Sequence, residues 1–217
     1  MKELTLKYLV KEPATINKNT PLIFLFHGYG SHEEDLFSFA SELPEQAVII
    51  SARAPLSLGF GSYAWYSINF TAEQGKFSDI PEAKKALELI GTFITEIQEL
   101  YKITPKKTFL IGFSQGSILS YATAFNLPEK VQKVVALSGY VNEELLPIEL
   151  NSKDYSKLDF FISHGSVDQV IPVSWAQQVP KFMEVHNISY SYQEYPVGHG
   201  VAPKNFFDFK KWIEERL

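Results

Sequence analysis

The chain has no cysteine and no excess of positive charge. Its 217 residues include no Cys, which excludes a disulfide framework, a thiol nucleophile and a zinc site held by cysteine. Lys and Arg number 20 against 25 Asp and Glu, so the formal net charge is −5. Binding to nucleic acid needs a basic surface that displaces counterions from the phosphates. We therefore expect no nucleic-acid partner.

Long hydrophobic runs are also missing. No stretch approaches the roughly eighteen consecutive apolar residues of a membrane-spanning helix. The first part of the chain, residues 1–20, lacks an apolar run of signal-peptide length. The sequence therefore predicts no stable insertion into a membrane and, if Met1 is the natural start, a cytoplasmic location.

Motifs for metals and nucleotides are absent from the sequence as well. There is no His-Glu-x-x-His motif, no pair of histidines at helical spacing and no cluster of acidic ligands. Gly28 and Gly30 are not part of the glycine pattern that binds dinucleotides. We expect neither a metal nor a cofactor.

Strand-like and helix-like segments alternate along the chain. The strand-like segments are 4–10, 22–27, 47–52, 107–113, 131–138, 158–164 and 188–196. The helix-like segments are 33–43, 80–102, 114–126, 172–187 and 203–217, the fourth of which contains a proline. This alternation predicts an α/β fold with a mostly parallel central sheet and helices on both faces. We expect a single domain over residues 1–217, without a large cap, because the connection 139–157 is short.

Ser114 lies in the segment Gly112-Phe113-Ser114-Gln115-Gly116, between a strand-like and a helix-like run. This is the G-x-S-x-G pattern of a nucleophile elbow, a sharp turn that exposes the serine hydroxyl at the end of a strand. The small glycines let the strand and the helix approach each other closely. The pattern predicts that Ser114 is a nucleophile, and the alternative is a glycine-rich turn with an idle serine.

A serine nucleophile needs a histidine base and a carboxylate that orients the base, following in the order Ser, acid, His. His199 lies after the last strand-like segment, and its flanking glycines are expected to let the ring reach inward. Asp168 lies in the loop after segment 158–164. The alternatives are a surface histidine and an Asx-turn or helix-capping aspartate. His27 and His164 are expected to be structural histidines rather than bases.

An oxyanion hole needs two N–H donors. One is expected to be the amide of Gln115, the residue after the nucleophile. The other is expected from the loop His27-Gly28-Tyr29-Gly30-Ser31, with the Tyr29 amide as first candidate and Gly28 as the neighbour that could replace it.

Several blocks of sequence resemble one known family. They are HGYGSHEEDLF (27–37), AWYS (64–67), LIGFSQGS (110–117), ALSGY (136–140), HGSVDQVIPV (164–173) and YPVGHGV (195–201). They resemble the phospholipase/carboxylesterase family of α/β-hydrolases, which includes bacterial carboxylesterases and acyl-protein thioesterases. Because the chain has HGYGS and Ser117 where thioesterases usually have HGLGD and a second glycine, it is more similar to the bacterial esterase branch.

The resemblance implies an α/β-hydrolase fold, a Ser114–Asp168–His199 triad and an oxyanion hole at Tyr29 and Gln115. It also implies that a homodimer can form, since members of the family are often dimers. The implied activity is that of a serine carboxylesterase acting on small esters or thioesters. A pocket of modest depth, as the absence of a large cap predicts, favours short-to-medium acyl chains. The alternatives are an acyl-protein thioesterase, a lysophospholipase and a non-catalytic binding protein.

The stretch 56–79 is rich in aromatic residues and is the only segment expected to be free to wall an acyl pocket. Its aromatic side chains are Phe60, Tyr63, Trp65, Tyr66, Phe70 and Phe77. We expect Trp65, Tyr66 and Phe60 to line the pocket. The alternative is that this stretch packs into the core.

Overall fold

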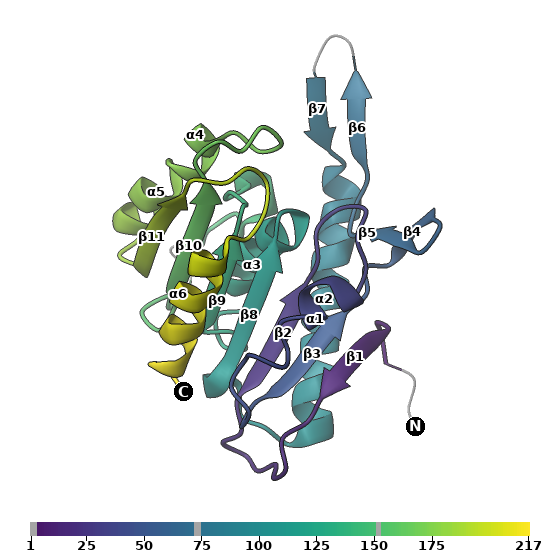
Figure 1. The fold of residues 1–217 in the computed structure, drawn as a ribbon, viewed down its shortest axis with the longest axis vertical. Coiled ribbons are helices and arrows are strands. Elements are labelled where there is room, and N and C mark those ends of the chain that lie inside the picture. The colour runs from purple at the N-terminus through teal and green to yellow at the C-terminus, as the bar shows by residue number, and fades with distance from the viewer. Residues whose placement is uncertain (1–3, 72–74, 151–152) are drawn as a thin grey trace.

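Figure 1 shows the computed structural model of the chain, which describes residues 4–71, 75–150 and 153–217. Seven strands form one sheet in the order β1–β3–β2–β8–β9–β10–β11. They are β1 (Tyr8–Lys11), β2 (Leu22–Phe26), β3 (Val48–Ala52), β8 (Thr108–Phe113), β9 (Lys133–Leu137), β10 (Asp159–Gly165) and β11 (Ser189–Tyr195). Every neighbouring pair is parallel except β1 and β3. The predicted mostly parallel sheet is confirmed.

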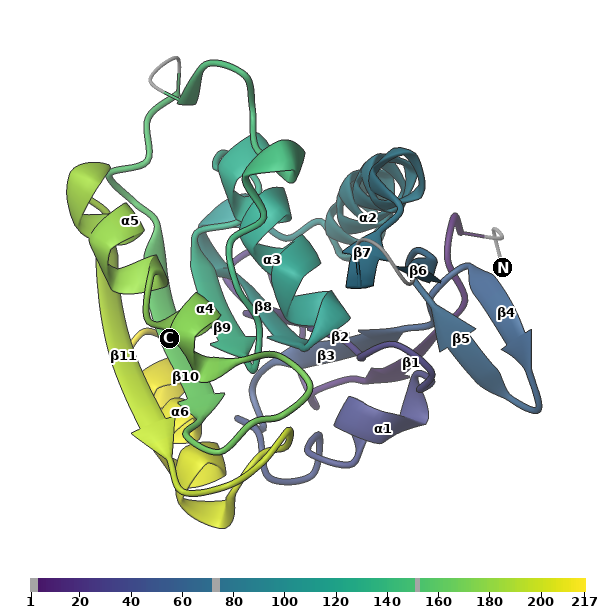
Figure 2. The ribbon, with the colours of Figure 1, turned by 90° about the horizontal axis from the view of Figure 1, so that it is seen from above.

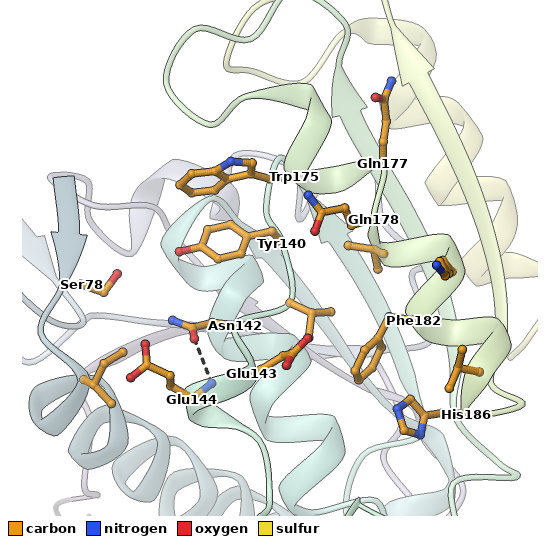
Figure 3. Close-up of a pocket in the computed structure, with 15 residues that line it drawn as sticks. Ser78, Tyr140, Asn142, Glu143, Glu144, Trp175, Gln177, Gln178, Phe182 and His186 are labelled. Carbon is orange, nitrogen blue, oxygen red and sulfur yellow. Dashed lines mark hydrogen bonds between the residues drawn. The ribbon is translucent and has the colours of Figure 1, made fainter. Parts of the chain in front are cut away.

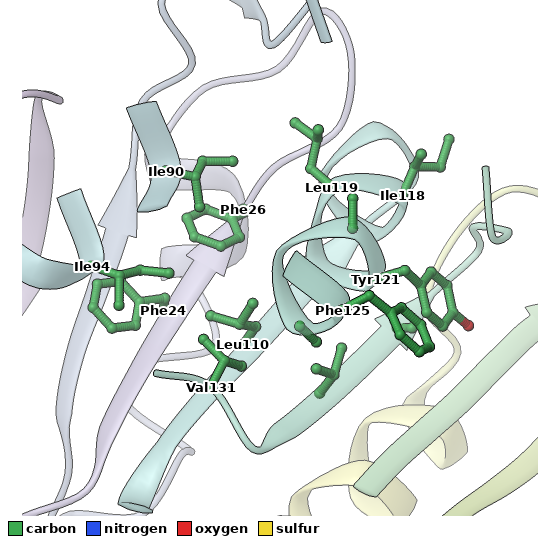
Figure 4. Close-up of a cluster of buried hydrophobic side chains, with 14 of the residues drawn as sticks. Phe24, Phe26, Ile90, Ile94, Leu110, Ile118, Leu119, Tyr121, Phe125 and Val131 are labelled. Carbon is green, nitrogen blue, oxygen red and sulfur yellow. The ribbon is translucent and has the colours of Figure 1, made fainter. Parts of the chain in front are cut away.

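Helices cover both faces of this sheet, as Figure 2 shows. The helices are α1 (Glu34–Phe37), α2 (Ile80–Tyr101), α3 (Gln115–Asn126), α4 (Val173–Ala176), α5 (Val179–Val185) and α6 (Pro203–Glu214), with two 3₁₀ turns, η1 (Pro105–Lys107) and η2 (Glu143–Leu145). Buried side chains of α2, α3 and α5 pack in one hydrophobic cluster, part of which appears in Figure 4. Those of α1 and α6 pack in a second cluster on the opposite face.

The sequence of β2 shows why the sheet is buried on both sides. All five residues of Leu22–Phe26 are buried. Successive side chains of a strand point to opposite faces, so Phe24 and Phe26 join the cluster beneath α2 and α3, while Ile23 and Leu25 join the cluster beneath α1 and α6. A strand with helices above and below it therefore needs apolar residues at every position.

The longest helix, α2, begins and ends where its sequence predicts. The Asp79 carboxylate accepts a hydrogen bond of 3.0 Å from the Glu82 amide and caps the first turn. Lys102 follows the last turn in the left-handed conformation, with a φ of 53°. An aspartate at this position is a favoured N-cap residue, so the start of α2 is encoded by its local sequence.

Three segments differ from their predicted form. The helix expected over 33–43 is the four-residue α1 followed by turns, and the segment 172–187 is two short helices, with Pro180 in the first turn of the second. The stretch 53–79 contains two hairpins that its pattern does not reveal. They are β4–β5 (Leu56–Gly59 and Ser62–Ala64) and β6–β7 (Ile68–Thr71 and Gly75–Ser78). Both hairpins lie outside the central sheet (Figure 1). Their side chains therefore need not alternate between polar and apolar residues, as those of a strand packed on a core do.

No cap is inserted between β9 and β10, where the described residues form only the turn η2. Among the helices of the described part of the chain, none has the length and apolar character needed to cross a bilayer. The carboxyl ends of the parallel strands therefore meet at an uncapped edge of the sheet, which is where ligands bind in folds of this class.

Candidate active site

Ser114 occupies a strained turn between β8 and α3. Its φ of 53° and ψ of −115° lie outside the conformations that L-residues prefer. Its amide nitrogen donates a hydrogen bond of 2.9 Å to the Leu137 carbonyl at the end of β9. Such strain costs about 1–3 kcal/mol and persists only where the surrounding structure enforces it.

The glycines around Ser114 are needed for close approach. A Cβ atom at position 116 would lie 2.0 Å from the Phe26 carbonyl oxygen on the neighbouring strand. One at position 112 would lie 2.4 Å from the Gly116 carbonyl oxygen. Both are impossible contacts between heavy atoms, so this sharp turn requires glycine at both positions.

The structure brings together the three side chains that the sequence singles out. His199 Nε2 lies 2.9 Å from Ser114 Oγ, and His199 Nδ1 lies 2.6 Å from Asp168 Oδ2. Because a carboxylate can only accept, Nδ1 carries the proton in this pair and Nε2 can accept the proton of the serine hydroxyl. The imidazole thus bridges hydroxyl and carboxylate.

The Asp168 carboxylate is held in the charged form. Its Oδ1 atom accepts hydrogen bonds from the amides of Val170, at 2.8 Å, and Ile171, at 3.0 Å. Burial is the largest single influence and raises the pKa of Asp168. The hydrogen bond from His199 and the two backbone amides together outweigh it, so the pKa lies below its ordinary value.

The loop that carries Asp168 packs directly on the loop that carries His199. A Cβ at Gly165 would lie 2.1 Å from the Gly198 carbonyl oxygen. The Ser166 amide also donates a hydrogen bond of 2.7 Å to the Tyr195 carbonyl. The expectation that the glycines beside His199 open the way for its ring is wrong. A Cβ at Gly198 or Gly200 would meet no atom within 4 Å, and it is Gly165 that allows the loops to touch.

The loop after β2 lies beside the nucleophile. A Cβ at Gly28 would come within 3.3 Å of the Ser114 Cβ. The His27 ring accepts a hydrogen bond of 3.1 Å from the Ala54 amide at Nε2, so Nδ1 carries the proton that it donates to the Gly28 carbonyl, at 2.7 Å. Burial lowers the pKa of His27 and keeps the ring neutral.

This contact orients the peptide group between Gly28 and Tyr29. The carbonyl and the N–H of a trans peptide point in opposite directions, so the Tyr29 amide points away from the His27 ring. Among the described residues, no acceptor is found for this amide. Gln115 is the first residue of α3, where an amide has no partner within the helix. Two N–H groups near Ser114 are therefore available to a ligand.

The cavity at Ser114 is small and is not lined by the predicted aromatic residues. Its volume is about 210 Å³. Its lining residues are Gly28, Tyr29, Ser31, Asp35, Ile68, Phe113, Ser114, Val170 and His199. The sequence could have indicated Phe113, which directly precedes Ser114, and Val170, which lies two residues after Asp168. Nothing in the sequence pattern distinguishes Ile68.

The prediction that Trp65, Tyr66 and Phe60 line the pocket is therefore corrected. Trp65 and Tyr66 are each only 1% exposed and belong to the core. Trp65 packs edge-on against Phe26 and donates from Nε1 to the His27 carbonyl, at 2.9 Å. Phe60 is fully exposed in the turn of the β4–β5 hairpin. The side chains of Phe70 and Phe77 lie outside the described residues.

A larger hollow of about 1050 Å³ lies elsewhere on the molecule (Figure 3). It is bounded by the segment after β9 and by α4 and α5, and the rings of Tyr140 and Trp175 meet at its edge with centroids 4.9 Å apart. It shares no lining residue with the cavity at Ser114. Its size is therefore no guide to the space around the nucleophile.

Within residues 4–71, 75–150 and 153–217, no group of three His, Asp or Glu side chains is arranged to hold a metal ion. The arrangement at Ser114 instead combines a hydroxyl, a base, a carboxylate and two free amides. These are the parts that acyl transfer through a serine requires.

The sheet order, the strand–turn–helix at Ser114 and the uncapped edge define an α/β-hydrolase. The profile of the Phospholipase/Carboxylesterase family matches residues 10–217, and the chain belongs to this family. The family that the sequence motifs predict is thereby confirmed.

Curated relatives and solved structures agree with this assignment. The chain is 26% identical over 211 residues to acyl-protein thioesterase 1 of Kluyveromyces lactis, covering 90% of this chain and 92% of that protein. It is 25% identical to a probable carboxylesterase of Oryza sativa subsp. japonica, covering 94% and 80%. Its fold matches that of esterase PE8 with a TM-score of 0.82 at 24% identity, covering all of both chains. It matches that of the Bacillus cereus carboxylesterase with a TM-score of 0.81 at 19% identity, covering 98% of this chain and 95% of that one.

Proposed function

We propose that the protein is a serine carboxylesterase that hydrolyses small carboxylic esters through an acyl-enzyme intermediate. The observation that carries the proposal is the position of His199, within hydrogen-bond distance of both Ser114 and Asp168. Family membership supports the class of reaction.

In the first step, His199 Nε2 takes the proton of the Ser114 hydroxyl as its oxygen attacks the carbonyl carbon of the ester. The π electron pair of the ester C=O bond moves onto the carbonyl oxygen. The Tyr29 and Gln115 amides donate to this oxyanion. Each such donor typically stabilises the transition state by about 2.7–4 kcal/mol. Asp168 stabilises the imidazolium and holds its orientation.

In the second step, the tetrahedral intermediate collapses. The bond to the leaving oxygen breaks, and His199 Nε2 gives its proton to that oxygen, which releases an alcohol. The acyl group stays on Ser114 Oγ. A water molecule then gives a proton to Nε2 and attacks the acyl carbon. Collapse of this second intermediate breaks the bond between the acyl carbon and Ser114 Oγ, releases the carboxylic acid and returns the proton from Nε2 to Oγ.

Short-to-medium acyl chains remain the proposed substrates. The cavity of about 210 Å³ at Ser114 supports this choice because it leaves room for a small group only. A thioester passes through the same steps with a thiol as leaving group. Curated relatives named acyl-protein thioesterase 1 support that alternative, whereas a lysophospholipase activity has support only from the name of the family.

The experiment that tests the proposal combines covalent labelling with a substrate panel. The wild-type protein should react with a fluorophosphonate probe and should hydrolyse esters from acetyl to dodecanoyl with a preference for the shorter chains. The Ser114→Ala variant should do neither. A correctly folded wild-type protein that neither labels nor hydrolyses any ester or thioester would instead be a non-catalytic binding protein.

We further propose a single domain over residues 1–217, a cytoplasmic location and the homodimer that the family resemblance implies. Sedimentation of the purified protein at several concentrations would test the dimer.

A further inference from the structure

His164, the penultimate residue of β10, is a buried histidine that the proposed reaction does not use. Its side chain is fully buried. Its Nε2 atom lies 2.9 Å from the Ile171 carbonyl oxygen and 3.3 Å from Asp168 Oδ2. Its Nδ1 atom is buried and has no hydrogen-bond partner among the described residues.

These contacts determine the protonation of the ring. A carbonyl oxygen can only accept a hydrogen bond, so Nε2 of His164 carries the proton. The hydrogen bond of this N–H group goes to the Ile171 carbonyl, and Nε2 lies 3.3 Å from Asp168 Oδ2, the atom that accepts from His199 Nδ1. His164 thus packs against Oδ2 of the triad carboxylate, whereas the two backbone amides bind Oδ1.

Two side-chain hydrogen bonds, one from His164 and one to Asp168, hold the backbone of Ile171 at the end of the loop. The Ile171 amide donates to Asp168 Oδ1, at 3.0 Å, and the Ile171 carbonyl accepts from His164. His164 belongs to β10, which pairs with β9 over residues 159–163 and with β11 over residues 159–165. The ring thus ties the far end of the loop, and with it the carboxylate, to a strand of the central sheet.

We propose that His164 is a positioning residue for the triad, whose Nε2–H group holds Ile171 in place and, through the Ile171 amide, the Asp168 carboxylate against His199. The inference deepens the proposed function and rests on it. Loss of this donor frees the Ile171 carbonyl, so that the loop that carries Asp168 can move away from His199. A displacement of about 1 Å in such a group can lower the rate by about a hundredfold.

Three substitutions separate positioning from simple packing. In His164→Gln, the side-chain NH₂ group can occupy the place of Nε2 and still donate to the Ile171 carbonyl. In His164→Asn, the NH₂ group falls near the place of Nδ1, where no acceptor was found. His164→Leu keeps an apolar side chain of moderate size and removes the donor altogether.

A matched control lies on the same strand. Ser163, the neighbour of His164, is 1% exposed, and its hydroxyl accepts a hydrogen bond of 3.0 Å from Asn205 on α6. Ser163→Ala removes one buried hydrogen bond from β10 without touching the Asp168 loop. Any effect of His164 variants that this change reproduces is an effect of stability alone.

The experiment measures kcat and KM for a short 4-nitrophenyl ester, with thermal unfolding of every variant. We expect His164→Leu and His164→Asn to lower kcat by up to about a hundredfold with KM little changed. His164→Gln should restore most of the lost kcat, and Ser163→Ala should keep it. If His164→Leu does not fold, the comparison between Gln and Asn still tests the idea.

Equal kcat values for the Gln and Asn variants, or a full kcat for the Leu variant, would overturn the role of His164. Neither result touches the proposed function as long as Ser114→Ala abolishes turnover and labelling. Conversely, full activity of Ser114→Ala would overturn the proposed function itself.

Discussion

Gln115 Oε1 accepts a hydrogen bond of 2.8 Å from the amide of Trp65, fifty positions earlier in the chain. The amide group of the same side chain donates to the Tyr66 carbonyl, at 2.7 Å. The residue after the nucleophile therefore ties the aromatic stretch to the start of α3. This tie explains why Trp65 and Tyr66 are in the core and not in the cavity at Ser114.

Replacing Trp65 should affect stability rather than chain-length preference. Trp65→Ala removes a buried ring that packs on Phe26, and such changes cost about 3–5 kcal/mol. Phe60→Ala, in the exposed turn of the same stretch, should change stability by no more than about 0.5 kcal/mol. Urea unfolding and the ratio of kcat/KM across ester chain lengths check both. A changed ratio in either variant would mean that this stretch does line the substrate pocket.

Replacing Ser114 with glycine should stabilise the fold, because it relieves the strained backbone at this position. Glycine tolerates a φ of 53°, whereas alanine does not. The relief of about 1–3 kcal/mol outweighs the extra freedom of glycine in the unfolded chain, about 0.4–1 kcal/mol. Ser114→Gly should therefore unfold at a higher urea concentration than Ser114→Ala, with both inactive. Equal midpoints would mean that the turn stores no strain.

Asp168→Asn should abolish most turnover while the fold is kept. Asparagine has the same shape and can still accept from the Val170 and Ile171 amides. Its NH₂ group then faces His199 Nδ1 and cannot accept the Nδ1 proton, and it carries no charge to stabilise the imidazolium. The same change in a serine-protease triad lowers kcat by about 10⁴-fold. Steady-state kinetics checks the rate, and circular dichroism checks the fold. A loss of less than tenfold would assign the acid role to another carboxylate.

The ion pair of Glu33 and Arg53 should make stability depend on pH. The Arg53 guanidinium donates to the Glu33 carboxylate through two nitrogens, one of them Nε at 2.7 Å. This hydrogen bonding, despite burial, holds the pKa of Glu33 below its ordinary value of 4.5. Since the folded pKa is depressed, the contribution is complete above pH 4.5 and is lost as the pH falls through the lower folded value.

Glu33→Gln should therefore lose about 1.5–3 kcal/mol at neutral pH, the range for hydrogen bonds to charged groups. Urea unfolding above and below pH 4.5 should show the difference from wild type shrinking as the solution becomes acidic. Glu215→Gln removes a carboxylate from an exposed ion pair with Lys211 at 3.9 Å and serves as control, with an effect of no more than about 1 kcal/mol. A difference that does not change with pH would contradict the assignment.

Local patterns predicted most of the central sheet and the residues of the candidate site. β2, β3 and β8 are mostly apolar runs, and each lies within one residue of its predicted range. Ser114, Asp168 and His199 were found because each follows a strand-like segment in the order that an elbow motif requires. The structure brings all three together.

Other features could not be read from local patterns. An aromatic run has the same composition in a pocket wall as in a core, so Trp65 and Tyr66 were placed in the wrong environment. The hairpin β6–β7 pairs Ile68 with Ser78, and no periodicity in the sequence of this stretch predicts it. The spacing of His164 and Asp168 is visible in the sequence, but the direction of the imidazole toward Ile171 is not.

The sequence by itself determined the alternation of central strands with helices, the family and the three side chains proposed as the triad. These follow from residue type, spacing and turn requirements, all of which act over short distances along the chain. Only the tertiary structure decided the size of the cavity, the residues that wall it and the contacts that hold Asp168. Those properties depend on which distant segments pack against one another, because the burial of a ring and the partner of a donor are set by neighbours in space.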